Sequence, residues 1–231
     1  MHIHPIHRRI GLFFAVIFCL SFVAASSWAT MVTWDLNPSN QNAAVGSSSH
    51  TYTSQSFSII AYGFDNHGGV GTPHELFYKN AMDDAGAVER GLGLVGTPHN
   101  ELQVTLTGPA NFIQFDLTSL ITSGFTNGKI SVGSIQAGES FAIYGSNAVG
   151  TLGLQLGGTY GSTFDNQSIV LPNFGQYDFY SIVAATADVL PVSISAELPA
   201  VPEMNAMWPI VALMLVLVST HAWRRRAAKN A

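Results

Sequence analysis

Acidic side chains that could bind a metal ion are concentrated in residues 65–101. Four of them, Asp83, Asp84, Glu89 and Glu101, offer the carboxylate oxygens that Ca2+ prefers in proteins. Their spacing matches no EF-hand, and the sequence contains no Asp-x-Asp-x-Asp-Gly loop. Solvated loop acids are therefore the simpler expectation, with no cofactor. A structural Ca2+ at these four residues is the alternative interpretation.

The same stretch contains one local repeat with a histidine in each copy. Residues 70–76 resemble residues 95–102, and the two copies contain His74 and His99. If the two loops lay side by side, both histidines and the neighbouring glutamates could bind zinc. No His-Glu-x-x-His motif is present, so two exposed loop histidines are the simpler expectation.

Other residue types with catalytic potential form no recognisable motif. A nucleophilic serine needs a positioned base, and no Gly-x-Ser-x-Gly elbow is present. A glycosidase needs two carboxyl groups at a defined separation, which scattered acids in a sequence do not reveal. We therefore expect no enzymatic activity, and a hydrolase of unrecognised type is the least favoured alternative.

The elements that must position these residues are short strands. Several windows alternate polar and apolar residues, which is typical of strands with one buried face. We predict an all-β fold, an antiparallel β-sandwich of jelly-roll type, over residues 30–199. The expected strands are Met31–Leu36, Tyr52–Ile60, Leu102–Thr107, Phe112–Leu117, Ile130–Ile135, Phe141–Tyr144, Ser168–Leu171, Phe179–Ala184 and Val189–Leu198. We expect Tyr177–Ala184 and Val189–Leu198 to form a hairpin, and Asn127-Gly128 to form a turn.

Charge and cysteine usage exclude several classes of function. Residues 30–199 contain three basic and thirteen acidic residues, a balance of −10. A nucleic-acid partner is therefore excluded, because phosphate binding needs a basic surface. The one cysteine, Cys19, lies near the N-terminus, so residues 30–199 can form neither a disulfide nor a cysteine-ligated zinc site.

The N-terminus is typical of a secretory signal. Basic residues precede an apolar run from Ile10 to Val23, and small residues follow up to Ala29. We predict that residues 1–29 form a signal peptide that is cleaved after Ala29. Cleavage after Ala25 and an uncleaved anchor are the alternatives.

The C-terminus contains a second apolar run, at about 206–223. Trp208 and Trp223 bracket it, as interfacial aromatics do, and Arg224, Arg225 and Arg226 follow. We predict a transmembrane helix here, with a buried core helix as the alternative. The basic residues at both ends then place both ends in the cytoplasm and residues 30–199 outside.

A short box, Val201-Pro202-Glu203, stands before this run. The box, one apolar helix and an arginine cluster at the very C-terminus together resemble the PEP-CTERM sorting signal, although Met204 stands where that family has a second proline. The resemblance implies that residues 200–231 are a sorting and anchor segment and that exosortase is a partner. It also implies an exported precursor anchored in the inner membrane, and later a protein of the cell surface or extracellular matrix.

The resemblance extends to the role of the middle domain. Residues 89–94, 100–102, 112–117 and 141–146 are similar to secreted domains that precede this signal. The implied role is structural or adhesive, in the envelope or the exopolysaccharide matrix. A polysaccharide-binding module, stabilised by Ca2+, is the alternative.

Overall fold

The computed structural model describes residues 29–82, 86, 88–105, 108–199 and 207–229. Thr30–Pro199 forms one compact unit, and the C-terminal helix belongs to a second unit. The predicted sorting residues Val201, Pro202 and Glu203 lie outside the described residues, as does almost all of the predicted signal peptide. Ala29, the predicted last residue of that peptide, is described and exposed.

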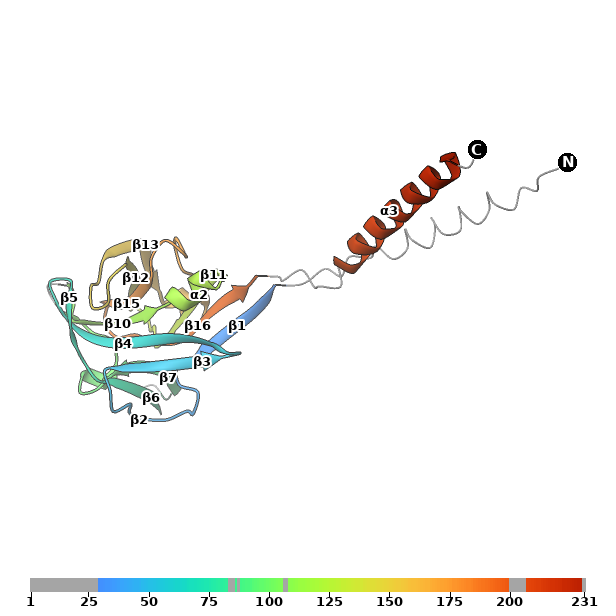
Figure 1. Ribbon diagram of the computed structural model, residues 1–231. Coiled ribbons are helices and arrows are strands. Elements are labelled where there is room, and N and C mark those ends of the chain that lie inside the picture. Colours follow the sequence, from blue (N-terminus) through green and yellow to red (C-terminus); the bar gives the residue numbers. More distant parts are fainter. Residues whose placement is uncertain (1–28, 83–85, 87, 106–107, 200–206, 230–231) are drawn as a thin grey trace. The chain divides into compact units, whose positions relative to one another are not determined.

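The compact unit is built from antiparallel sheets in the described part of the chain, which confirms the predicted all-β class (Figure 1). The largest sheet has the order β13 (Leu154–Gly161), β12 (Ser140–Ser146), β15 (Phe179–Thr186), β10 (Asn111–Asp116), β4 (Phe57–His67) and β3 (Ser49–Ser54), with β5 (Val70–Pro73) beside β4. A second sheet has the order β1 (Thr30–Asp35), β16 (Leu190–Leu198), β11 (Thr126–Gly133) and β14 (Ser168–Val170).

Smaller elements complete the unit. A third sheet has the order β2 (Ala43–Ala44), β6 (Leu76–Met82) and β7 (Val88–Leu94), and β8 (Val104–Thr105) pairs with β9 (Gly108–Pro109). The short helices are η1 (Pro98–Asn100), α2 (Thr118–Thr122) and η2 (Ser162–Phe164).

One hydrophobic core takes side chains from the three larger sheets. Phe115 and Tyr180 come from the largest sheet, Trp34 and Ile194 from the second, and Leu92 from the third, and each is almost fully buried. Burial of such side chains supplies most of the favourable free energy of folding. The third sheet, which carries the candidate site, is therefore fixed to the rest of the domain through the core.

The predicted hairpin between Tyr177–Ala184 and Val189–Leu198 is wrong. Strand β15 pairs with β10 and β12 in the largest sheet, whereas β16 pairs with β1 and β11 in the second sheet. The chain crosses between the sheets at residues 187–189, where Ala187 has a left-handed backbone with φ 53°. Alternation predicted both strands but carries no information about their partners.

Two further segments differ from the prediction, one predicted as a strand and one predicted as a turn. The window Tyr52–Ile60 contains the end of β3, a turn at Gln55-Ser56 and the start of β4, and both turn residues have positive φ. Gln-Ser is not one of the dipeptides that favour such turns, so nothing in these two residue types predicts the turn. Asn127-Gly128 lies within β11, where the register against β16 shifts, so it forms a bulge and not a turn.

The first and last strands of the unit are neighbours. Strand β1 pairs with β16 over six residues, with Thr30 opposite Leu198 and Asp35 opposite Ser193 (Figure 1). The chain therefore enters and leaves this unit at adjacent positions on one sheet.

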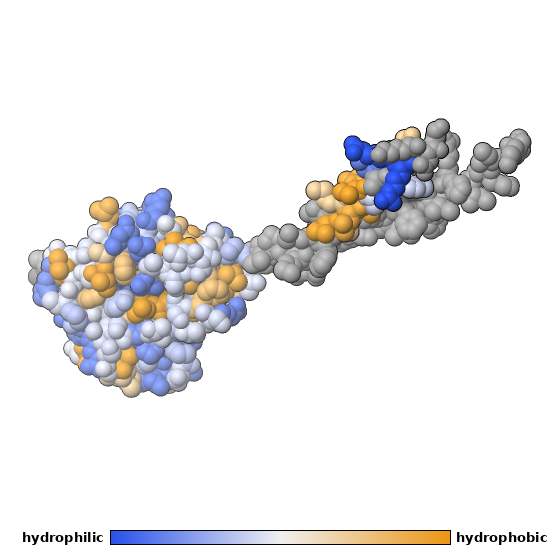
Figure 2. Space-filling model, in the orientation of Figure 1, coloured by the Kyte–Doolittle hydropathy of each residue, from blue (hydrophilic) through white to orange (hydrophobic). Residues whose placement is uncertain are grey.

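Helix α3 (Met207–Lys229) overlaps the apolar run predicted at about 206–223. Figure 2 shows apolar side chains on its visible face and hydrophilic ones near one of its ends. Among the residues that the structure describes, no helix combines the length and apolar character needed to cross a membrane. The predicted flanking residues Trp208, Trp223, Arg224, Arg225 and Arg226 all lie in α3.

Glycines in β7 allow neighbouring backbone to approach the third sheet. A Cβ at Gly91 would lie 2.6 Å from the carbonyl oxygen of Pro191 in β16. A Cβ at Gly93 would overlap the carbonyl oxygen of Asn100 at the end of η1. Because Gly91 and Gly93 have no side chains, β16 and the η1 segment have room to pack directly against β7.

We expect Gly93→Ala to lower the free energy of unfolding by about 1–3 kcal/mol, because backbone atoms must move to admit the methyl group. Gly158→Ala in β13 is the matched control, since nothing lies within 4 Å of its added Cβ. That change should stay within about 0.5 kcal/mol. Urea unfolding of both variants checks the difference, and equal stabilities would contradict the close approach at Gly93.

Candidate functional site

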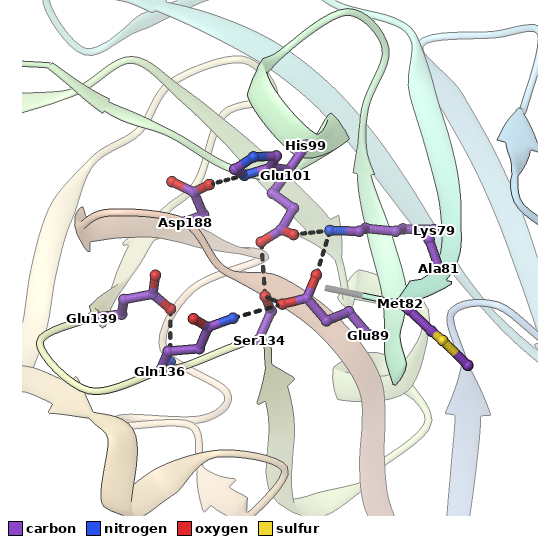
Figure 3. Close-up of a pocket in the computed structure, with 10 residues that line it drawn as sticks. All are labelled: Lys79, Ala81, Met82, Glu89, His99, Glu101, Ser134, Gln136, Glu139 and Asp188. Carbon is purple, nitrogen blue, oxygen red and sulfur yellow. Dashed lines mark hydrogen bonds and ion pairs between the residues drawn. The ribbon is translucent and has the colours of Figure 1, made fainter. Parts of the chain in front are cut away.

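An open pocket of about 340 Å³ lies where the third sheet meets three loops (Figure 3). Strand β6 contributes Lys79 and β7 contributes Glu89. Glu101 follows η1, and Ser134 follows β11. Asp188, from the crossing between β15 and β16, lies on the rim. The pocket thus joins five segments that are far apart in the sequence.

Three charged residues form the floor of the pocket. Lys79, Glu89 and Glu101 are 6%, 8% and 1% exposed. The Lys79 ammonium donates to Glu89 Oε2 at 2.5 Å and also to Glu101 Oε1. Buried charges persist only where partners compensate for their lost hydration, and here each carboxylate faces the same ammonium group.

Ser134 and Gln136 satisfy the remaining carboxylate oxygens. The Ser134 hydroxyl lies 2.5 Å from Glu89 Oε1 and 2.9 Å from Glu101 Oε2, so it bridges the two carboxyl groups. Gln136 Nε2 donates to Glu89 Oε1 at 3.1 Å. Glu89 and Glu101 therefore belong to one connected network, which Figure 3 shows as a chain of dashed contacts.

The surroundings of Glu89 and Glu101 shift their pKa values in opposite directions. Burial raises the pKa of Glu101 to about 7, and Lys79 offsets only part of this rise. Burial also raises the pKa of Glu89, but hydrogen bonds from Lys79 and Ser134 outweigh it, so the net pKa of Glu89 is lowered. Near neutral pH the floor therefore holds Glu89 as a carboxylate and Glu101 as a partly protonated carboxyl group.

The rim contains a second ion pair. His99 Nδ1 lies 2.8 Å from Asp188 Oδ2, and this bond raises the pKa of His99. Glu139 accepts from the backbone N–H of Gln136 at 2.7 Å. The rim pair is more exposed to solvent than the floor, so it contributes little to stability.

Left-handed backbone occurs in three segments around the pocket. His99, Asn100 and Ser134 have φ values of 57°, 56° and 57°, and Ala187 precedes Asp188 with φ 53°. Non-glycine residues adopt this conformation at a cost of roughly 1–2 kcal/mol each. The surrounding contacts hold these segments in place, including the Thr97 hydroxyl, which donates to the carbonyl oxygens of Leu94 and Glu101.

The predicted Ca2+ site is only partly described. The structure brings Glu89 and Glu101 together, but around the Lys79 ammonium group. Asp83 and Asp84 lie outside the described residues. Within the described ranges, no group of three or more histidine, cysteine, aspartate or glutamate residues is arranged to hold a metal ion.

The two repeated histidines have separate partners. His74 Nδ1 lies 2.7 Å from Asp65 Oδ1, and its Nε2 lies 2.6 Å from the carbonyl oxygen of Val95. His99 is instead paired with Asp188. The repeated segments are thus not equivalent in structure, because the first contains β5 and the second contains η1.

Sequence reasoning found the two glutamates of the floor but missed Lys79 and Ser134. Lys79 is one of three basic residues in residues 30–199 and follows directly after the apolar window Leu76–Tyr78. A lone lysine at a buried position of a strand is a signal for a buried acidic partner. Ser134 gave no signal, since serine is abundant throughout the chain.

No protein-family model matches this chain, and no curated protein matches it.

We expect Lys79→Met to lower the free energy of unfolding by about 3–5 kcal/mol, because it leaves two buried carboxyl groups without their cation. The matched control is Lys129→Met, which changes a half-buried lysine of β11 and should cost less than about 1 kcal/mol. Urea unfolding at neutral pH measures both. Equal losses of stability in the two variants would show that the buried Lys79 ammonium contributes no more to stability than the half-buried Lys129 does.

His74 should make stability depend on pH. Burial lowers the pKa of His74, but its bonds to Val95 and Asp65 outweigh burial and raise the pKa above 6.5. The stabilisation is therefore complete below that value and is lost as the pH rises through the raised pKa.

We expect the wild-type protein to be more stable than His74→Gln. The difference in their free energies of unfolding should be about 1 kcal/mol larger near pH 6 than near pH 9. Thermal unfolding at both pH values provides the measurement. His67→Gln, an exposed histidine in β4, should behave as wild type does. A pH-independent gap between wild type and His74→Gln would refute the ionised ring.

Proposed function

We propose that this chain is an exported surface or matrix protein that exosortase processes at its C-terminal segment. In this proposal residues 1–29 are removed as a signal peptide, and residues 200–231 hold the precursor at the inner membrane. The mature domain has a structural or adhesive role in the envelope or the exopolysaccharide matrix.

The pairing of β1 with β16 is the observation that carries the proposal. Strand β1 begins at Thr30, one residue after the proposed cleavage position, and β16 ends at Leu198, before the Val201-Pro202-Glu203 box. Cutting at both positions would remove no strand of the compact unit. Both membrane-directed segments would also leave the domain from neighbouring strands, as expected when both lead to the same membrane.

The pocket supports a structural role more than a catalytic one. The oxygens of Glu89 and Glu101 are engaged by Lys79, Ser134 and Gln136, so neither carboxyl group faces the pocket without a partner. The two larger sheets share one core, and in our interpretation they are the two layers of a β-sandwich. Such a domain, free of cysteine, suits a rigid surface element.

The test is the intact mass of the protein recovered from its native host and from a strain that lacks exosortase. We expect a species that begins near Thr30 and ends near Pro202–Glu203 in the first strain only. In the second strain the protein should retain residues 206–231 and stay in the membrane fraction.

A matched pair of variants tests the sorting box itself. Glu203→Gln should block the C-terminal cleavage, whereas Glu197→Gln, in β16, should be processed normally. A protein that keeps residues 206–231 in both strains would rule out exosortase processing.

A further inference from the structure

The floor of the pocket combines an amine and two carboxyl groups that are all shielded from water. Lys79, Glu89 and Glu101 are each more than nine-tenths buried. Ionised groups are unfavourable in such an environment, and hydrogen bonds compensate only in part. A reaction that converts one amine and one acid into a neutral amide would remove that cost permanently.

The reacting atoms are already held together. Lys79 Nζ is in contact with Glu101 Oε1, and therefore lies beside the carboxyl carbon of Glu101. Strand pairing fixes Lys79 in β6, and Ser134 holds the other oxygen of Glu101 at 2.9 Å. Groups positioned in this way react at very high effective concentration, because little freedom remains to be lost.

The third group is placed to move protons. Glu89 Oε2 lies 2.5 Å from Lys79 Nζ, where it can accept a proton from the ammonium group. Its other oxygen lies 2.5 Å from the Ser134 hydroxyl, which also contacts Glu101 Oε2. A hydrogen-bonded path therefore runs from the amine, through Glu89 and Ser134, to the oxygen that would leave.

We infer that Lys79 and Glu101 form an intramolecular amide bond, with Glu89 as the catalytic proton carrier. Glu89 takes a proton from the Lys79 ammonium, and the free amine attacks the carboxyl carbon of protonated Glu101. The C–N bond forms. The C–Oε2 bond then breaks as Glu89 returns that proton through Ser134 to the leaving hydroxyl group and takes the second proton of the Lys79 nitrogen. The balance is one ammonium group, the neutral Glu101 carboxyl group and the Glu89 carboxylate converted into one amide, one water molecule and protonated Glu89, with no oxidant or other reactant.

The acidities of the two glutamates agree with these roles. The raised pKa of Glu101, about 7, leaves part of this side chain near neutral pH in the neutral form that an amine can attack. The lowered pKa of Glu89 keeps it ionised, with an oxygen 2.5 Å from Lys79 Nζ to take the proton. Burial lowers the pKa of Lys79, but its hydrogen bonds to Glu101 and Glu89 outweigh burial and raise it, so this proton transfer is an uphill step. The pocket is open to solvent, which gives the released water a way out.

The bond would join β6 to the segment after η1. Residues 30–199 contain no cysteine, so this domain has no disulfide to perform that task. An amide needs no oxidising compartment and cannot be opened by thiols. The inference does not depend on export or sorting, and it can fail or hold independently of the proposed function.

The test is a tryptic map of the unfolded full-length chain. Between residues 30 and 129 trypsin can cut only after Lys79, Arg90 and Lys129. If Lys79 is amidated, cleavage after it fails, and the peptide that ends at Arg90 stays joined to peptide 91–129. The joined species should be lighter than the sum of the two peptides by one water molecule.

Glu89→Gln is the decisive variant. It keeps Lys79 and Glu101 but removes the proton carrier, so we expect normal cleavage after Lys79 and no joined peptide. Circular dichroism checks that this variant is folded, and Glu139→Gln on the rim is the control that should remain joined. Unjoined wild-type peptides of full mass would overturn the amide, and a joined peptide in Glu89→Gln would overturn the role of Glu89.

Discussion

One buried ammonium group between two carboxyl groups determines how this corner of the domain is built. Lys79 can remain in the interior only if Glu89 and Glu101 reach it, and their other oxygens need Ser134. Four segments must therefore arrive at one point. Gly93 has no side chain where the carbonyl oxygen of Asn100 approaches β7, and Ser134 has left-handed backbone, so both lie where these segments meet.

Charge also fixes the small third sheet to its neighbours. Two of the three basic residues in the domain sequence, Lys79 and Arg90, lie on the hairpin of β6 and β7. Arg90 donates to the side chain of Asp35 at the end of β1 and to the carbonyl oxygen of Asn37 at 2.7 Å. Both cations of the hairpin therefore pair with acidic side chains that lie outside it, Lys79 with Glu101 and Arg90 with Asp35.

The sequence predicted the all-β class and most strands of the two larger sheets, because alternation reports burial directly. The sequence did not predict which strands pair with each other or which side chains meet in space. Tyr177–Ala184 and Val189–Leu198 read as a hairpin because they are consecutive, yet their neighbours in space lie elsewhere in the chain. Glu89 and Glu101 were identified as candidate ligands, but the cation beside them came from a lysine that only the pairing of β6 with β7 brings there.

The adjacency of β1 and β16 has a mechanical consequence. Tension applied between the two ends of the domain would act first on the pair Thr30–Leu198, and then on each following pair in turn. An antiparallel ladder loaded from one end opens like a zipper, with few hydrogen bonds resisting at any moment. The result differs when the domain is held by its body and pulled only by its C-terminal end. Strand β16 then slides lengthwise against both β1 and β11, and many hydrogen bonds share the force.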